Sequence, residues 1–134
     1  MNNVNINDQA FVNSKEYQEF LKENPSQGFL DIRVYTASQA IPINNLKVVV
    51  SKTIGNNNVI FYEGYSDASG VVPTIILPTP KLNKDDLIIP NGINYDILAI
   101  YVPDNVSEKF EVQMFEDVNV LQSINITLTN MGGY

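Results

Sequence analysis

Hydrophobic and polar positions alternate along most of the chain between residues 28 and 129. Leu30, Ile32 and Val34 are each separated by one residue, and Leu46, Val48 and Val50 repeat this spacing. Because successive side chains of a strand point to opposite faces, a period of two predicts strands with one buried face. Further segments of this kind begin at Val59 and span 71–77, 93–102, 109–116 and 120–129.

Turn-forming residues separate these segments. Gly55 to Asn58 can supply the positive φ angles of a hairpin, and Asp67 to Gly70 is a second turn signal. Pro73 makes 71–77 an edge or bulged strand, and 81–92 is expected to be a long surface loop. About seven strands without helical crossovers predict an all-β fold, a seven-stranded antiparallel β-sandwich.

The first 27 residues have a different character. Residues 1–12 form a polar arm in which apolar residues alternate with asparagines, and Asn13 with Glu16 fits a capping box that begins a helix over 14–23. An apolar stripe at helical spacing must lie against another surface. The apolar residues of the arm are Val4, Ile6, Phe11 and Val12, and those of the helix are Tyr17, Phe20 and Leu21.

The chain divides into three parts on these patterns. Residues 1–27 are the arm and a connecting helix, 28–130 the sandwich, and 131–134 a glycine-rich tail. A chain of 134 residues is long enough for one domain with its own core.

Charge and composition limit the kinds of binding partner that the sequence predicts. The formal net charge is -7, and the eight Lys and Arg residues are scattered, so the sequence predicts neither a nucleic-acid nor a membrane partner. Residues 1–8 lack a secretory signal pattern, and no stretch approaches the ~20 apolar residues of a membrane span. We expect a location outside the cell or on a cell or spore surface without a classical signal, with the cytoplasm as the alternative.

Reactive side chains are scarce. The chain has no histidine and no cysteine, which excludes thiol catalysis and histidine-based triads and leaves only oxygen ligands for a metal. The adjacent carboxylates at 85–86 and 116–117 fall in loops, where charged residues are simply solvated. The sequence therefore predicts no enzyme, no catalytic residue and no cofactor. A calcium site is chemically allowed, and its ligands would come from Asp67, Asp85, Asp86 and Asp96. The simpler interpretation is that these are ordinary turn and loop carboxylates exposed to solvent.

Several segments carry a resemblance to a known family. They are Leu-Asp-Ile-Arg-Val-Tyr-Thr-Ala at 30–37, Ala-Ile-Pro-Ile at 40–43, Leu-Lys-Val-Val-Val at 46–50, Ser-Asp-Ala-Ser-Gly at 66–70, Ile-Leu-Pro at 76–78 and Tyr-Asp-Ile-Leu-Ala at 95–99. Over about 28–129 the chain resembles a carboxypeptidase-regulatory-like domain of Gram-positive, spore-forming bacteria. The resemblance implies a transthyretin-like sandwich that serves as an accessory module. Related adhesin sandwiches carry Lys to Asn isopeptide bonds; Lys47 and Asn130 are the pair to consider here, but Lys47 is expected to face water.

Function is inferred from these features together. A sandwich preceded only by an arm and a helix suggests a non-enzymatic structural protein that assembles with copies of itself, or with other structural subunits, into a fibre or on a surface, spore or particle. Strand addition by the arm would provide the contact, and folding of the arm back onto its own domain is the alternative. A second hypothesis is a module that binds cell-wall glycan or peptidoglycan through Tyr95 and Tyr101, and a third is a phage or tailocin structural component.

Overall fold

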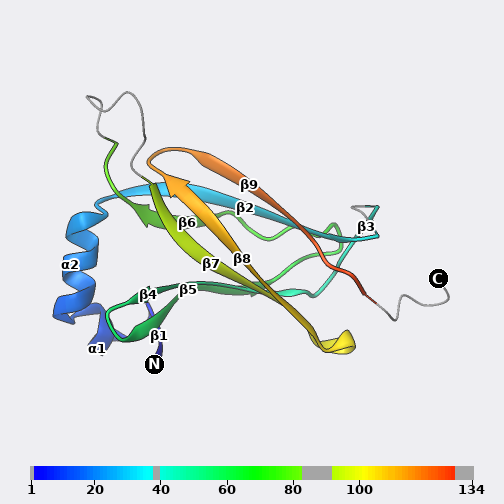
Figure 1. Ribbon diagram of the computed structural model, residues 1–134, viewed down its shortest axis with the longest axis horizontal. Helices are drawn as coiled ribbons and strands as arrows, with labels where there is room; N and C mark the ends of the chain where they lie inside the picture. Colours follow the sequence, from blue (N-terminus) through cyan, green and yellow to red (C-terminus); the bar gives the residue numbers. More distant parts are fainter. Residues whose placement is uncertain (1, 38–39, 83–91, 129–134) are drawn as a thin grey trace.

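The chain folds as two β-sheets that face each other and a helical segment at one end (Figure 1). This computed structural model describes residues 2–37, 40–82 and 92–128. Strands β4 and β5 lie in one layer and strands β2, β6 and β9 in the other. Within the described residues, no helix is long and apolar enough to cross a membrane.

The larger sheet has five strands in the order β1, β5, β4, β7, β8. Neighbouring strands of this sheet are antiparallel, except that β1 is parallel to β5. A β-bulge interrupts the pairing of β4 with β5 between Val50 and Ser51. The strand bounds are β1 Asn2–Asn5, β4 Lys47–Ile54, β5 Asn57–Tyr65, β7 Gly92–Tyr101 and β8 Val106–Phe115.

The second sheet is built around one long strand, β2. The strand β9 pairs with one edge of β2 in parallel, and β3 and β6 pair antiparallel with β2. The strand bounds are β2 Ser26–Thr36, β3 Ile41–Pro42, β6 Ile75–Thr79 and β9 Asn119–Asn125.

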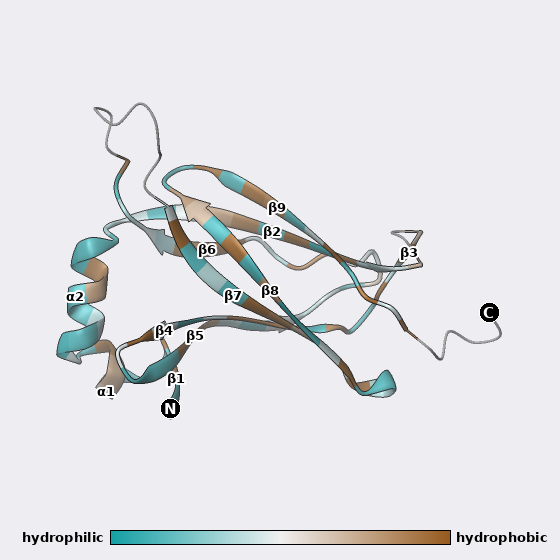
Figure 2. Cartoon of the chain, in the orientation of Figure 1, coloured by the Kyte–Doolittle hydropathy of each residue, from teal (hydrophilic) through white to brown (hydrophobic). Residues whose placement is uncertain are grey.

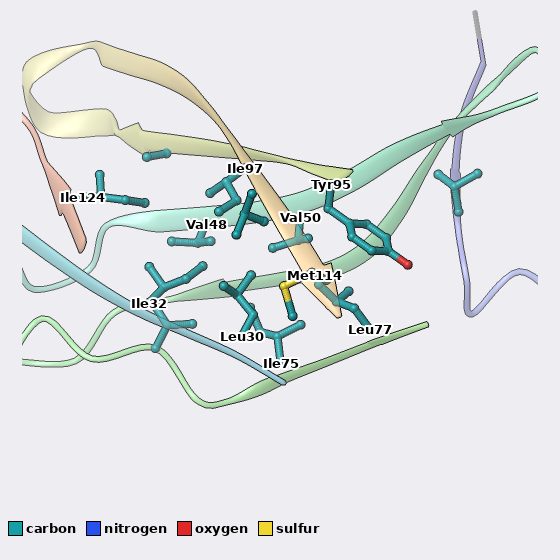
Figure 3. Close-up of a cluster of buried hydrophobic side chains, with 14 of the residues drawn as sticks. Leu30, Ile32, Val48, Val50, Ile75, Leu77, Tyr95, Ile97, Met114 and Ile124 are labelled. Atoms are coloured by element: carbon teal, nitrogen blue, oxygen red, sulfur yellow. The ribbon is translucent and has the colours of Figure 1, made fainter. Parts of the chain in front are cut away.

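The core lies between the two sheets (Figure 3). Alternate residues of β2, β4 and β7 supply its largest part, since Leu30, Val48 and Ile97 are all fully buried. Bands of hydrophobic and hydrophilic residues alternate along β8 and β9 in Figure 2, as the period of two in the sequence requires. The two-sheet sandwich predicted from the sequence is confirmed.

The helical segment closes one end of the sandwich. Helix α1 spans Gln9–Val12 and helix α2 spans Lys15–Glu23, close to the predicted helix. The predicted N-cap is displaced by one residue. Ser14 caps α2 by accepting a hydrogen bond from the backbone N–H of Tyr17, whereas Asn13 ends the short helix α1. The sequence did not reveal α1, and without it Asn13 looked like the first cap.

The N-terminal arm lies on its own domain. Strand β1 adds to the edge of β5, with Val4 opposite Val59, and the N–H of Ile6 donates to the carbonyl of Ile60 at 3.1 Å. Val4, Ile6 and Val12 pack on the core as partly buried residues, and Phe11 is buried in it. This is the folded-back alternative for the arm.

The strands differ from the predicted ones in their number and pairing and in the position of β6. The described residues form nine strands, because the short strands β1 and β3 add to seven longer ones, and two of the pairings are parallel. Strand β6 begins at Ile75, so Pro73 precedes it and Pro78 lies within it instead. The turn at Gly55 forms as expected, with φ of 59°. The expected loop over 81–92 lies mostly outside the described residues.

Candidate functional site

Tyr95 and Tyr101, the predicted ligand face, point into the sandwich. Only 1% of Tyr95 is exposed, and Tyr101 packs partly buried against the core. The residues of β7 alternate between the two faces of the sheet as predicted, but the face that carries Tyr95 and Tyr101 is the inner one. Tyr95 therefore cannot offer its ring to a ligand in solvent. The burial of Tyr95 corrects the hypothesis that this residue binds cell-wall glycan.

Tyr95 instead links the two sheets next to α2. Its hydroxyl donates to the backbone carbonyl of Pro78 on β6 at 2.5 Å, and the ring meets Phe61 edge to face at 5.3 Å between centroids. Burial raises the pKa of Tyr95 well above its usual range, with a smaller contribution from Tyr17. The Lys52 ammonium lies 5.7 Å from the Tyr95 ring centroid. These contacts are structural, because the hydroxyl is occupied and the ring is enclosed.

The predicted connector residues of α2 join the same aromatic cluster. The Phe20 ring lies 5.8 Å from that of Phe61, and the Tyr17 ring 5.2 Å from that of Phe11. Tyr17 and Leu21 also line a hollow of about 360 Å³ beside the helix, together with Ile6, Pro78 and other residues. The lining of this hollow is mainly apolar. Its lining among the described residues contains no charged side chain, and the hydroxyl of Ser26 donates to Glu116 at 2.9 Å.

Chemically useful groups gather elsewhere, on the outer face of the five-stranded sheet. Ser51 on β4 lies directly opposite Asp96 on β7, and Asp96 lies directly opposite Glu111 on β8. In the next row, Leu98 lies between Val49 and Lys109. Cβ atoms of directly opposed residues on antiparallel strands are about 5 Å apart, so the hydroxyl, carboxylate and ammonium groups share one small area.

This part of the sheet is hollowed. A depression of about 340 Å³ is lined by Asn3, Val49, Ser51, Thr53, Asn58, Asp96, Leu98 and Lys109. The arm forms one border, since the Asn58 side chain donates to Oδ1 of Asn3 at 3.2 Å. Val49 and Leu98 provide an apolar patch among polar groups, a combination that is common in sites for small ligands.

Neighbouring charges on this face are partly neutralised. Lys47 and Glu63 form an ion pair at 2.7 Å, and this contact raises the pKa of Lys47. Lys47 therefore faces outward, as expected, and the residue considered as its isopeptide partner, Asn130, lies outside the described residues. The Asn94 side chain donates to Glu111 at 3.0 Å, which holds that carboxylate at the border of the depression.

The two possible calcium ligands within the described residues, Asp67 and Asp96, lie on different elements. Asp67 sits in a turn, where its Oδ1 accepts the backbone N–H groups of Ser69 and Val71 at 2.8 and 2.9 Å. Asp96 lies on β7 in the outer sheet face, and Asp85 and Asp86 lie outside the described residues. Among residues 2–37, 40–82 and 92–128, no group of three acidic side chains is placed to hold a metal ion.

Sequence reasoning missed Ser51 and Lys109 as members of one site. Lys109 stands at an outward position of a predicted strand and gives no sign of its neighbours. Ser51 follows directly after the buried Val50, so the alternation of β4 places it on the outer face, but its neighbours there come from another strand. The register that pairs β4 with β7 is not visible in local alternation. From the sequence, Asp96 was considered only as a possible calcium ligand.

Comparisons with known proteins establish the fold. The 5-hydroxyisourate hydrolase of Klebsiella pneumoniae is similar to this chain at a TM-score of 0.54 and 14% identity, over 77% of this chain and 92% of that one. The fold is a transthyretin-like β-sandwich. An (S)-allantoin synthase is similar at a TM-score of 0.50 and 9% identity, over 82% of this chain, and the chain spans 45% of that protein. No family model and no curated protein matches the sequence.

The expectation of a non-enzymatic, self-assembling structural protein is wrong. It rested on the lack of histidine and cysteine, on the solvated carboxylates and on the arm and helix that precede the sandwich. The hydrolase, which is matched over 92% of its length, and the synthase are both enzymes, as their names state. A transthyretin-like sandwich with little attached to it can therefore carry catalysis. At identities of 14% and 9%, the likeness itself concerns the fold.

Proposed function

We propose that the chain is an enzyme that hydrolyses a small polar substrate in the depression on the five-stranded sheet. The observation that carries this proposal is the meeting of Ser51, Asp96 and Lys109 in one hollow of about 340 Å³. That volume lies at the small end of ligand sites, so it suits a compact molecule with hydrogen-bonding groups. Support for an enzyme also comes from the two solved structures that share the fold.

The absence of histidine and cysteine determines the division of roles. A carboxylate is then the suitable general base. Asp96 would accept a proton from the water as its oxygen bonds to the carbonyl carbon, and would return it to the leaving group as the bond between that group and the carbon breaks. Lys109, as an ammonium, would stabilise the negative charge that develops on the carbonyl oxygen of the substrate. Ser51, which is 8% exposed, would orient the water or the substrate through its hydroxyl. Val49 and Leu98 would pack against the apolar part of the substrate.

The test is a hydrolysis assay with the full chain. Freshly prepared 5-hydroxyisourate, the compound after which the Klebsiella pneumoniae hydrolase is named, and p-nitrophenyl acetate are suitable probes, followed by absorbance. We expect wild-type protein to accelerate at least one of them above buffer. Asp96→Asn should lower kcat/KM about 10²-fold or more, and Lys109→Gln by a similar factor.

The matched controls change charge without touching the depression. Lys15→Gln and Glu19→Gln alter an exposed ion pair on α2 and should leave the rate unchanged. Far-ultraviolet circular dichroism checks that every variant is folded. Wild-type protein without acceleration, or an Asp96→Asn variant as active as the controls, would overturn the proposal.

We also propose that the chain is a carboxypeptidase-regulatory-like domain within this fold. The turns that carry the resemblance support this assignment. Gly70 has φ of 73° and follows Asp67, whose side chain accepts two backbone N–H groups, and Ala40 precedes the short strand β3. A location outside the cell or on its surface belongs to the same proposal. A fusion to a reporter that is active only outside the cytoplasm would test that location.

A further inference from the structure

Strand β9 forms one border of the second sheet. The N–H of Phe29 donates to the carbonyl of Val118, and the N–H of Ile126 donates to the carbonyl of Tyr35. In a parallel pair these bonds direct the backbone groups of even-numbered β9 residues toward β2. The N–H and C=O groups of Asn119, Leu121 and Ser123 consequently point away from the sheet. Within the described residues, β9 pairs with β2 alone.

The β9 edge lacks the features that usually discourage pairing with another chain. Charged side chains, proline, bulges and short length protect edge strands. The segment 118–128 has no charged residue and no proline. By contrast, edge strand β8 carries Glu108, Lys109 and Glu111, β6 contains Pro78, and β1 has four residues. Among the described edges, the seven-residue β9 is the unprotected one.

An exposed apolar side chain lies at the middle of this edge. Leu121 is 62% exposed on the outer face of the sheet, and Val118 is 40% exposed near the start of the strand. A chain of net charge -7 repels its own copies at most of its surface. A neutral strand with an apolar centre is the place where two copies can approach without opposing like charges.

We propose that two copies of the chain form a closed dimer by antiparallel pairing of β9 with β9 around a two-fold axis at Leu121. In this register Leu121 lies opposite Leu121 of the second copy, and Asn119 opposite Ser123. All these residues have outward backbone groups, so each pair can exchange two N–H···O=C bonds. The side-chain amide of Gln122, which donates to the Ser123 carbonyl at 3.2 Å, would give up that acceptor to the partner strand. A two-fold contact uses both edges and closes the assembly.

The inference does not rest on the proposed hydrolase function, because the depression and β9 lie on different sheets. Multi-angle light scattering on full-length protein, over a range of concentrations, measures the mass directly. We expect the mass to rise from one chain to two chains and to stop there. Leu121→Lys places two like charges opposite each other at the axis and should leave single chains at concentrations where the wild type is dimeric. Ile76→Lys is the matched control, since Ile76 is 57% exposed on β6 in the same sheet, and should dimerise like the wild type.

The lack of cysteine allows a second, independent measurement. Opposed residues of a hydrogen-bonded antiparallel pair have Cα atoms about 5.5 Å apart, within disulfide range. Leu121→Cys should therefore form a disulfide-linked dimer under mild oxidation, whereas Ile76→Cys should not. The proposal is overturned by wild-type protein that stays a single chain together with equal cross-linking of both variants. It is equally overturned by a dimer that survives Leu121→Lys, or by a mass that grows beyond two chains.

Discussion

Thr79 carries a hydroxyl oxygen that is fully buried and has no hydrogen-bond partner within the described residues. An unsatisfied buried hydroxyl costs about 1–3 kcal/mol, and an apolar group of the same shape removes that cost. We therefore expect Thr79→Val to raise the free energy of unfolding by about 1 kcal/mol, measured by urea denaturation. Thr79→Ser keeps the hydroxyl, loses a methyl group and should be less stable than the wild type. A Thr79→Val protein that is less stable than the wild type would show that the hydroxyl has a partner, such as a buried water.

Tyr95 makes the stability of the protein depend on alkaline pH. Burial raises the pKa of Tyr95 above its ordinary value of 10.0, so the folded state holds the phenol proton more tightly than the unfolded state does. This stabilisation is fully present below pH 10 and is lost as pH rises above it, by up to about 1.4 kcal/mol per pH unit for one group. We expect the free energy of unfolding to fall above pH 10 and to fall less steeply in Tyr95→Phe. A Tyr95→Phe protein whose free energy of unfolding falls as steeply as that of the wild type would contradict this expectation.

At the residue scale, the sequence predicted which residues of a strand share a face better than it predicted which face is buried. Alternation placed Tyr95 and Ile97 on one side of β7, which is correct, but nothing in a period of two says which side is buried when both sets contain apolar residues. The opposite set of β7 includes Leu98 and Ile100, so both faces looked partly apolar. The pairing of Asp96 with Ser51 depends on the register of β4 with β7, which is a property of the assembled sheet.

At the scale of elements, helix α2 depends on its contact with the sandwich. Nine residues are too few for a stable isolated helix, and Phe20 and Tyr17 bury its apolar side against Phe61. We expect Phe20→Ala to lower the free energy of unfolding by about 3 kcal/mol, because the substitution removes a buried ring. Lys15→Ala, at a side chain 86% exposed, should change it by less than about 0.5 kcal/mol. A Phe20→Ala protein as stable as the Lys15→Ala protein would show that α2 contributes little to the fold.

Strands and the helix were visible in the sequence, but their pairing was not. The segments around Leu30, Val48 and Ile97 form strands as predicted, since local alternation reports burial of one face. The parallel pairing of β2 with β9 brings together segments some 90 residues apart, and local alternation is the same for a parallel and an antiparallel partner. The arm gave an equally ambiguous signal, because alternation at Val4 and Ile6 suits any sheet edge.

At the scale of the whole molecule, a single hydrophobic cluster joins the two sheets and the helical end. It extends from Phe11 and Tyr17, near the arm, through Met114 to Ile124 on β9. Since no part of this cluster is separate from the rest, we expect the domain to unfold in one cooperative step, with a urea m-value of about 1–3 kcal/mol/M. In a protein whose other five tyrosines (35, 62, 65, 101 and 134) are replaced by phenylalanine, tyrosine fluorescence reports on the helical end, where Tyr17 and Tyr95 lie, whereas far-ultraviolet circular dichroism reports on the sheets. The two signals should give one midpoint, and Phe20→Ala should shift both by the same amount. Two separate midpoints, with only the fluorescence midpoint shifted by Phe20→Ala, would instead make the arm and helices a unit that unfolds independently of the sandwich.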